Sequence, residues 1–222
     1  MNHKRLGELD EQLHEAFDDY LSMLAVGSIA VGDPWIEGRS DMDILLIFKP
    51  DSTIKFPQIE QILGEFDFDD TYEFTAMPRD HFGQANSKYA FSNRYRTKTL
   101  FGPDFVPESE LPDDESISDI WAHGLSDDIH RLKKYVANSV FWGVSRIRKK
   151  LWKQFKHTFM HLAIRAYGLS GDYPCTRREI VDRSQSPELA EVYEVLHSID
   201  HQEKERIVNS ARGLVSFLED LD

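Results

Sequence analysis

The stretch LAVGSIAVGDPWIEGRSDMDILLIF, residues 24–48, decides how this chain of 222 residues folds. Its last five residues, 44–48, form a continuous apolar run that Pro50 stops, a pattern typical of a strand buried on both faces. A shorter apolar run, residues 24–26, precedes the pair Gly27-Ser28. Twelve residues, several of them turn formers, separate this pair from an Asp-x-Asp motif. We therefore expect a short strand, a long loop and a buried strand.

The Asp-x-Asp motif consists of Asp41 and Asp43, at the start of the buried strand. Residues two apart in a strand point to the same face, so the two carboxylates lie side by side. Carboxylates held this close repel each other and destabilise the fold unless a cation lies between them. Mg²⁺ commonly binds through one or two carboxylates together with substrate phosphates. By itself the motif is a weak signal, but together with the preceding Gly-Ser pair, the loop and the buried strand it predicts a magnesium site. The alternative is an acidic turn capped by an unrelated Gly-Ser pair.

The Gly27-Ser28 pair supplies the second half of the expected site. Glycine lets the backbone approach a phosphate closely, and the serine hydroxyl and nearby amides can donate hydrogen bonds to its oxygens. The order of apolar strand, Gly-Ser, variable loop and Asp-x-Asp resembles the signature of the DNA polymerase β-like nucleotidyltransferase superfamily. The resemblance implies that Gly27 and Ser28 hold the triphosphate tail, and that Asp41 and Asp43 bind two Mg²⁺ ions.

A third carboxylate is implied by the same resemblance, on a later strand. Residues 72–77 read as a strand closed by Pro78, and Glu73 lies inside it. The segment Tyr72-Glu73-Phe74-Thr75-Ala76 resembles the Leu-Glu-Val-Thr strand of streptomycin/spectinomycin adenylyltransferases, whose glutamate is the catalytic base. We expect Glu73 to join Asp41 and Asp43 in the catalytic and metal-binding set. Asp69 and Asp70 are the alternatives.

The remaining pattern predicts an α+β chain: an N-terminal nucleotidyltransferase domain with a mixed β-sheet, followed by a C-terminal helical bundle. Residues 103–119 hold three prolines and seven Asp or Glu, which indicates an exposed connection. We therefore expect a first domain at 1–106, an acidic linker at 107–118 and a helical domain at 119–222. Apolar spacing and capping signals predict helices over 3–20, 57–66, 125–141, 144–167 and 203–218, with helix starts at Thr176 and Ser186-Pro187.

The resemblance also sets expectations about substrates. Thr99-Leu100-Phe101-Gly102-Pro103 is similar to the Leu-Tyr-Gly-Pro segment that ends this domain in antibiotic nucleotidyltransferases. The implied reaction moves a nucleoside monophosphate from a nucleoside triphosphate, ATP being the expected one, to a hydroxyl of a small molecule. The alternatives are a transferase that acts on RNA or on a protein partner, and a catalytically silent nucleotide-binding module.

Charge is distributed unevenly along the chain, whose formal net charge is −13. Residues 129–171 contain ten Lys or Arg and no Asp or Glu, while the remainder holds 16 Lys or Arg against 39 Asp or Glu, a net of −23. Such asymmetry points to a partner of defined sign. The resemblance implies that cations of the helical domain hold triphosphate oxygens, and Lys133, Lys134 and Lys149 are the candidates. Nucleic acid is the alternative partner, which we do not favour because no RNA-binding motif is visible.

Composition narrows the class of protein further. Hydrophobic residues make up 41 % of the chain, enough for packed cores, and no apolar run approaches the roughly 18 residues of a membrane span. The N-terminus is charged rather than continuously apolar, so we expect no signal peptide. Cys175 is the only cysteine and has no base motif beside it. We expect a cytoplasmic protein without a membrane partner, in which His157 and His161 are ordinary helix residues.

Overall fold

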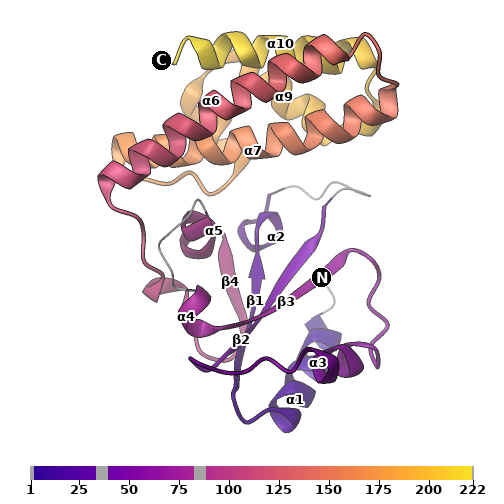
Figure 1. Ribbon diagram of the computed structural model, residues 1–222, viewed down its shortest axis with the longest axis vertical. Helices are drawn as coiled ribbons and strands as arrows, with labels where there is room; N and C mark the ends of the chain where they lie inside the picture. The colour runs from indigo at the N-terminus through magenta and orange to yellow at the C-terminus, as the bar shows by residue number, and fades with distance from the viewer. Residues whose placement is uncertain (1–2, 34–39, 83–88, 222) are drawn as a thin grey trace. The chain divides into compact units, whose positions relative to one another are not determined.

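A computed structural model of the chain describes residues 3–33, 40–82 and 89–221. The chain divides into two compact units, Met1–Pro112 and Asp113–Asp222 (Figure 1). Trp35, a loop tryptophan whose ring could stack on a base or an acceptor, lies outside the described residues. Within the described ranges, no helix combines the length and the apolar character that crossing a membrane requires.

The first unit is built on a mixed four-stranded sheet in the order β3-β2-β1-β4. Its strands are β1 Tyr20–Val26, β2 Met42–Phe48, β3 Tyr72–Pro78 and β4 Thr97–Phe101. β1 runs antiparallel to both β2 and β4, whereas β2 and β3 are parallel. The predicted mixed sheet is confirmed. β4 was not expected, because a five-residue strand that begins Thr-Lys-Thr has too weak an apolar pattern to be recognised.

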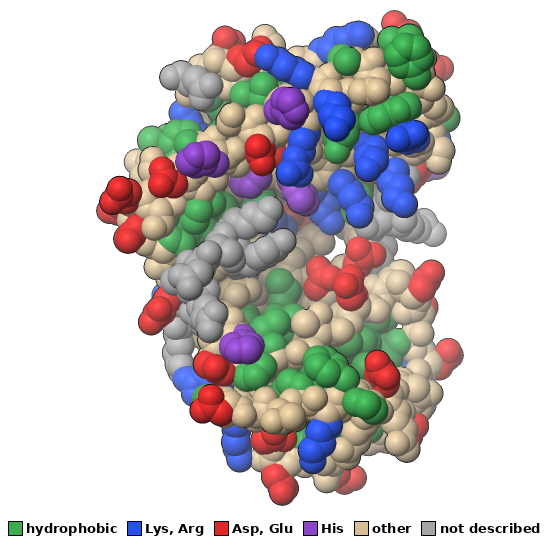
Figure 2. Space-filling model, viewed as in Figure 1, with side chains coloured by type: hydrophobic (Ala, Val, Ile, Leu, Met, Phe, Trp, Pro, Cys, Tyr) green, Lys and Arg blue, Asp and Glu red, His purple; other side chains and the backbone are tan. Residues whose placement is uncertain are grey.

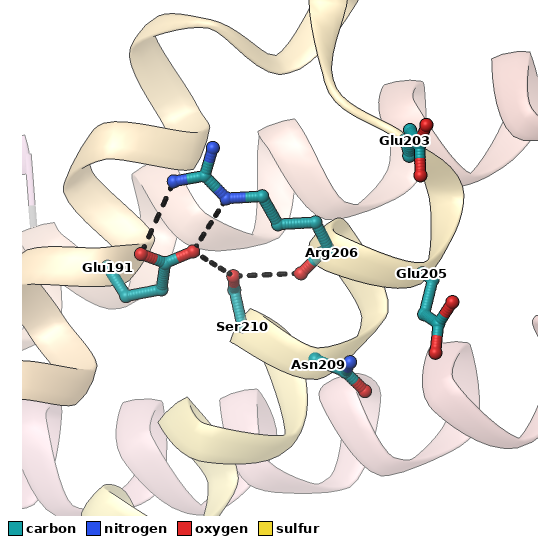
Figure 3. Close-up of a pocket in the computed structure, with 6 residues that line it drawn as sticks. All are labelled: Glu191, Glu203, Glu205, Arg206, Asn209 and Ser210. Atoms are coloured by element: carbon teal, nitrogen blue, oxygen red, sulfur yellow. Dashed lines mark hydrogen bonds and ion pairs between the residues drawn. The ribbon is translucent and has the colours of Figure 1, made fainter.

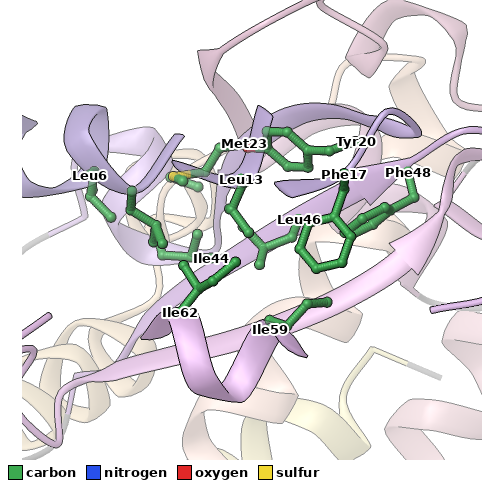
Figure 4. Packing of buried hydrophobic residues seen from close by; sticks show 12 residues of the cluster. Leu6, Leu13, Phe17, Tyr20, Met23, Ile44, Leu46, Phe48, Ile59 and Ile62 are labelled. Carbon is green, nitrogen blue, oxygen red and sulfur yellow. The ribbon is translucent and has the colours of Figure 1, made fainter. Parts of the chain in front are cut away.

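Short helices accompany this sheet: α1 His3–Ala16, α2 Ser28–Val31, α3 Phe56–Leu63, α4 Arg79–Phe82 and α5 Tyr89–Tyr95, with a 3₁₀ turn at Val106–Glu108. Buried side chains of α1 and α3 pack on one face of the sheet (Figure 4). Ile44 and Leu46 of β2 belong to that cluster, while Ile47 belongs to a second cluster with Phe82 of α4. β2 is therefore buried on both faces, as its apolar run predicted.

The first helix is shorter than the prediction of residues 3–20. α1 ends at Ala16, and Tyr20 already begins β1. The helical spacing of apolar residues continues past the end of the helix because Phe17 and Tyr20 pack into the same core as α1. The Tyr20 hydroxyl donates a 2.7 Å hydrogen bond to Asp10. Burial is the larger cause, and this hydrogen bond the second, of a raised pKa of Tyr20. Apolar spacing alone therefore could not locate the turn.

The second unit is helical, as predicted. Its elements are α6 Asp114–Asn138, α7 Val144–Ser170, α8 Arg177–Ser184, α9 Pro187–His197, a 3₁₀ turn at Ile199–His201, and α10 Lys204–Glu219. α6 begins inside the range expected to be linker. Asp113 caps it by accepting a 2.7 Å hydrogen bond from the Ser116 N–H, and the acids of the first turn suit the positive end of the helix. Acidic residues that indicated a linker thus belong to a helix start.

The predicted helix starts in the second half of this unit are confirmed. Thr176 and Glu179 form a complete capping box at α8, and Ser186 caps α9, whose first residue is Pro187. Gly143 separates α6 from α7.

A buried polar cluster joins α6 to α7. Asp128 of α6 accepts a 2.6 Å hydrogen bond from Gln154, and its second carboxylate oxygen lies 2.8 Å from Nδ1 of His161. All three side chains are buried. The position of His161 therefore follows from helix packing.

Candidate active site

Asp43 and Glu73 are neighbours at one end of the sheet. In the register of the strands, Asp43 of β2 lies opposite Val26 of β1 on one side and opposite Glu73 of β3 on the other. Paired residues on adjacent strands point to the same face of a sheet. The two carboxylates consequently share one face. Asp43 and Glu73 belong to the end of the sheet where β1 finishes and β2 and β3 begin, and Figure 1 shows these strand ends.

Gly27 follows β1 directly and lies against Asp43. Its backbone angles, φ 80° and ψ −145°, belong to a region that is essentially restricted to glycine. Its N–H donates a 2.7 Å hydrogen bond to the carbonyl of Arg96. A Cβ atom built on Gly27 would lie 3.4 Å from Oδ2 of Asp43. The expected phosphate-binding glycine and the expected metal ligand are thus brought together.

The turn after Gly27 is held by a buried ion pair. Ser28 begins the short helix α2, and the Asp33 N–H donates a 3.0 Å hydrogen bond to the Ser28 carbonyl. The Asp33 carboxylate accepts a 2.7 Å bond from the guanidinium of Arg96, and the Asp33 side chain is fully buried. Arg96 therefore contacts both ends of the segment 27–33, one through its carbonyl and the other through its side chain.

Sequence reasoning missed this pair. Asp33 was one of several turn formers in a long loop, and Arg96 lies 63 residues further along the chain. No motif connects them, because the contact depends on how β4 is placed beside β1.

Asp41 lies immediately before β2 and is exposed. Among residues 3–33, 40–82 and 89–221, no three Asp, Glu, His or Cys side chains are grouped so that they could hold a metal ion. The structure thus places Asp43 and Glu73 side by side, with Asp41 two residues before Asp43, rather than as one closed cluster of three.

Of the alternatives for the third carboxylate, Asp69 is engaged elsewhere. It accepts hydrogen bonds from both the hydroxyl and the N–H of Thr71, which lower its pKa in that order of importance. Asp69 therefore stabilises the turn that leads into β3. Asp70 is exposed in the same turn, outside the strand. The register position of Glu73 beside Asp43 supports Glu73 as the third carboxylate.

The donor chemistry at the sheet end fits Mg²⁺. Carboxylate oxygens are the ligands that this ion prefers, and it usually completes its shell with substrate phosphates and water. Asp43 borders Gly27, so a cation bound there would lie beside the turn expected to hold phosphates.

The three candidate lysines lie in the second unit. Lys133 of α6 forms an ion pair with Glu219 of α10. Lys134 of α6 and Lys149 of α7 are exposed. Their role in holding a triphosphate stays a prediction.

An open pocket of about 470 Å³ also lies in the second unit (Figure 3). It is lined by Glu191, Glu203, Glu205, Arg206, Asn209 and Ser210, none of which the sequence singled out. The hydrogen bond from Arg206 lowers the pKa of Glu191, and the same pairing raises the pKa of Arg206. This ion pair connects α9 to α10, so two of the side chains that line the pocket have a structural role in helix packing.

No protein-family model matches the chain, and no curated protein matches it. Among solved structures, it is similar to spectinomycin adenyltransferase AAD(9) from Enterococcus faecialis, determined with ATP and spectinomycin. That likeness has a TM-score of 0.52 and 12 % identity, and covers 99 % of this chain and 100 % of the other. A nucleotidyltransferase-like protein from Exiguobacterium sibiricum 255-15 gives a TM-score of 0.37 and 12 % identity, covering 94 % of this chain and 72 % of the other. The chain therefore has a nucleotidyltransferase fold that resembles the aminoglycoside nucleotidyltransferases.

Proposed function

We propose that the chain is a Mg²⁺-dependent nucleotidyltransferase that moves a nucleoside monophosphate, AMP being the expected one, to a hydroxyl of a small molecule. The observation that carries the proposal is the contact between the two halves of the motif: Gly27 lies against Asp43, which is in register with Glu73. A phosphate-binding turn next to paired carboxylates is what transfer from a triphosphate requires.

The proposed roles follow from these positions. Gly27 and Ser28 hold the triphosphate tail through backbone N–H groups and the Ser28 hydroxyl. Asp41 and Asp43 would hold Mg²⁺, which supplies charge neutralisation on the phosphates when bound. The acceptor oxygen forms a bond to the α-phosphorus while the bond from that phosphorus to the bridging oxygen breaks, and pyrophosphate leaves. Glu73 accepts the proton of the acceptor hydroxyl.

Charge favours a cationic acceptor. The first unit, which carries the proposed site, contains 21 Asp or Glu against 10 Lys or Arg. An acidic surface attracts cations and repels anions over the range of the Debye length. An amino sugar or aminocyclitol suits this unit better than an RNA does. The similar adenyltransferase was determined with spectinomycin, which belongs to that chemical class.

The test is transfer of label from α-labelled nucleoside triphosphates to a panel of acceptors, with Mg²⁺ present. The panel contains spectinomycin, streptomycin, kanamycin, a neutral disaccharide and an unstructured RNA. We expect labelled product and pyrophosphate with ATP and one of the aminocyclitols. Exclusive labelling of the RNA would contradict the acceptor class, and absence of transfer to every acceptor would contradict the reaction.

Variants connect the reaction to the proposed site. Glu73→Gln removes the proposed base at nearly constant size, and we expect the rate to fall about 10²–10⁴-fold. Glu65→Gln, an exposed acid of the same unit that lies outside the strands, is the matched control and should keep the parental rate. Equal rates in Glu73→Gln and the parent would remove Glu73 from the mechanism.

A further inference from the structure

One face of α7 carries an uninterrupted row of cations. Arg146, Lys149, Lys150 and Lys153 are exposed and recur every three or four residues, so they form a single stripe along the helix. We call these four residues the basic face of α7. Residues 129–171 include no acid that could neutralise it. Figure 2 shows Lys and Arg side chains gathered over this part of the helical unit.

The basic face is opposite the packed face of the helix. Ile147, Leu151 and Phe155 of α7 are completely buried. The cations are therefore held on a rigid helix whose other side is fixed in the core. None of the four forms an ion pair with any residue in the described part of the chain, so their charge faces solvent.

The start of α7 adds to this charge. Its N-cap is Gly143, which has no side chain to cap the helix, and its first turn contains no acid. The N–H groups of a first helical turn carry partial positive charge and bind anions. Arg146 lies in the same turn, with its guanidinium stacked 4.4 Å from the ring centroid of Trp142. Anion-binding groups thus continue from the helix start into the basic face.

Apolar side chains are exposed beside this end of the helix. Val140 is 77 % exposed and Phe141 is 85 % exposed, in the turn between α6 and α7. An exposed aromatic ring next to a row of cations is the combination with which proteins bind single-stranded nucleic acid, because the ring stacks on a base while cations contact phosphates.

We propose that the basic face of α7 and Phe141 bind a single-stranded nucleic acid. The phosphodiester chain would follow the helix from its N-terminus to Lys153, about 10 Å beyond Arg146 at 1.5 Å per residue. Phe141 would stack on a base at the end of this track. These residues all belong to the second unit, whereas Asp43 and Glu73 belong to the first, and the proposal does not rest on the proposed transferase reaction.

An anionic membrane fits the same surface less well. A helix that lies in a membrane interface inserts its apolar face, with the cations flanking it. The apolar face of α7 is already occupied by the core, which leaves only the short turn with Val140 and Phe141 to insert.

The test is fluorescence anisotropy of a labelled oligouridine titrated with the full chain over a range of salt concentrations. Four phosphate contacts predict that log K falls with log salt with a slope of about −3. The triple variant Arg146→Gln/Lys150→Gln/Lys153→Gln should bind more weakly, with a slope smaller in magnitude by about 2. Phe141→Ala should weaken binding at least about fivefold with an unchanged slope, since it removes stacking alone.

The matched control is Lys4→Gln/Lys55→Gln/Arg212→Gln, three exposed cations outside the basic face. It should bind as the parent does. The helical signal in the far-ultraviolet circular dichroism spectrum tests whether each variant folds. Lys150→Arg/Lys153→Arg keeps the positive charge at both positions and should retain binding. Equal losses in the control and in the triple variant would overturn the proposal. Failure of the parent to bind at low salt, or binding of phosphatidylserine vesicles but not oligouridine, would overturn it as well.

Discussion

Gly27 is the residue whose backbone most constrains the candidate site. Alanine there would adopt angles that cost about 1–3 kcal/mol, and its Cβ would lie 3.4 Å from Oδ2 of Asp43. We expect Gly27→Ala to lower the unfolding free energy by about that amount and to weaken Mg²⁺-nucleotide binding. Denaturant unfolding and calorimetric titration measure the two effects. Gly143→Ala, where a Cβ meets nothing within 4 Å, should leave nucleotide binding unchanged. Equal nucleotide affinity in Gly27→Ala and the parent would show that the turn does not hold the phosphates.

The ion pair between Asp33 and Arg96 gives a second prediction at this scale. Removing one partner of a buried pair leaves the other charge uncompensated, which costs about 3–5 kcal/mol. We expect Asp33→Asn and Arg96→Met each to destabilise the chain. The double variant should be less unstable than the sum of the two, because the second substitution removes the orphaned charge. Denaturant unfolding of all four proteins completes the cycle, and additive losses would show that the pair is not coupled.

Individual residues differ in how well the sequence predicts them. Asp43 and Glu73 could be assigned to strands because their neighbours are apolar, and the register brings the two side by side. That Asp41 stays just outside β2 could not be predicted, since a strand pattern does not say at which residue pairing begins. Arg96 contributes through a tertiary contact that leaves no local pattern.

At the scale of the elements, the contact between α6 and α7 is sensitive to added volume. A Cβ on Gly124 would lie 2.5–2.7 Å from ring atoms of His161, whose place is fixed by Asp128. Overpacking of this kind costs about 1–3 kcal/mol. We therefore expect Gly124→Ala to lower the melting temperature, although alanine favours a helix more than glycine does.

Gly213→Ala in α10 is the matched control. The nearest atom to its added Cβ is the Glu188 Cγ at 3.6 Å, an ordinary contact. Helix propensity then acts alone, and this variant should be as stable as the parent or more stable. Thermal unfolding of the two variants decides the matter: if Gly124→Ala is stabilised as well, the packing of His161 against Gly124 is not tight.

Elements were predictable where local chemistry defines them. The capping residues of α8 and α9 mark their starts in the sequence, and the structure confirms both. The predicted end of α1 was wrong because Phe17 and Tyr20, which follow the helix, continue its apolar spacing. The predicted start of α6 was wrong because the acidic residues of its N-cap and first turn resemble those of an exposed linker. β4 forms because it pairs with β1, and its five residues do not show the apolar pattern that would identify a strand in the sequence.

At the scale of the whole molecule, the two units carry different charge. The first holds 10 Lys or Arg against 21 Asp or Glu, and the second holds 16 against 18, with its cations concentrated in residues 129–171. The first distribution suits a cationic acceptor and the second an anionic partner. The uneven distribution of charge was visible in the sequence. That four of the cations share one exposed face of α7 could be seen only from the structure of the helix.

The most direct test of the candidate site is the melting temperature of the chain with and without Mg²⁺ and a non-hydrolysable ATP analogue. A ligand that binds only the folded state at one hundred times its Kd stabilises it by about 2.7 kcal/mol. We predict a clear rise for the parent and none for Asp41→Asn/Asp43→Asn, which without ligand should be no less stable than the parent because a repulsion has been removed. An equal rise in both proteins would mean that the nucleotide binds elsewhere, and would contradict the assignment of Asp41 and Asp43 to a nucleotide-metal site.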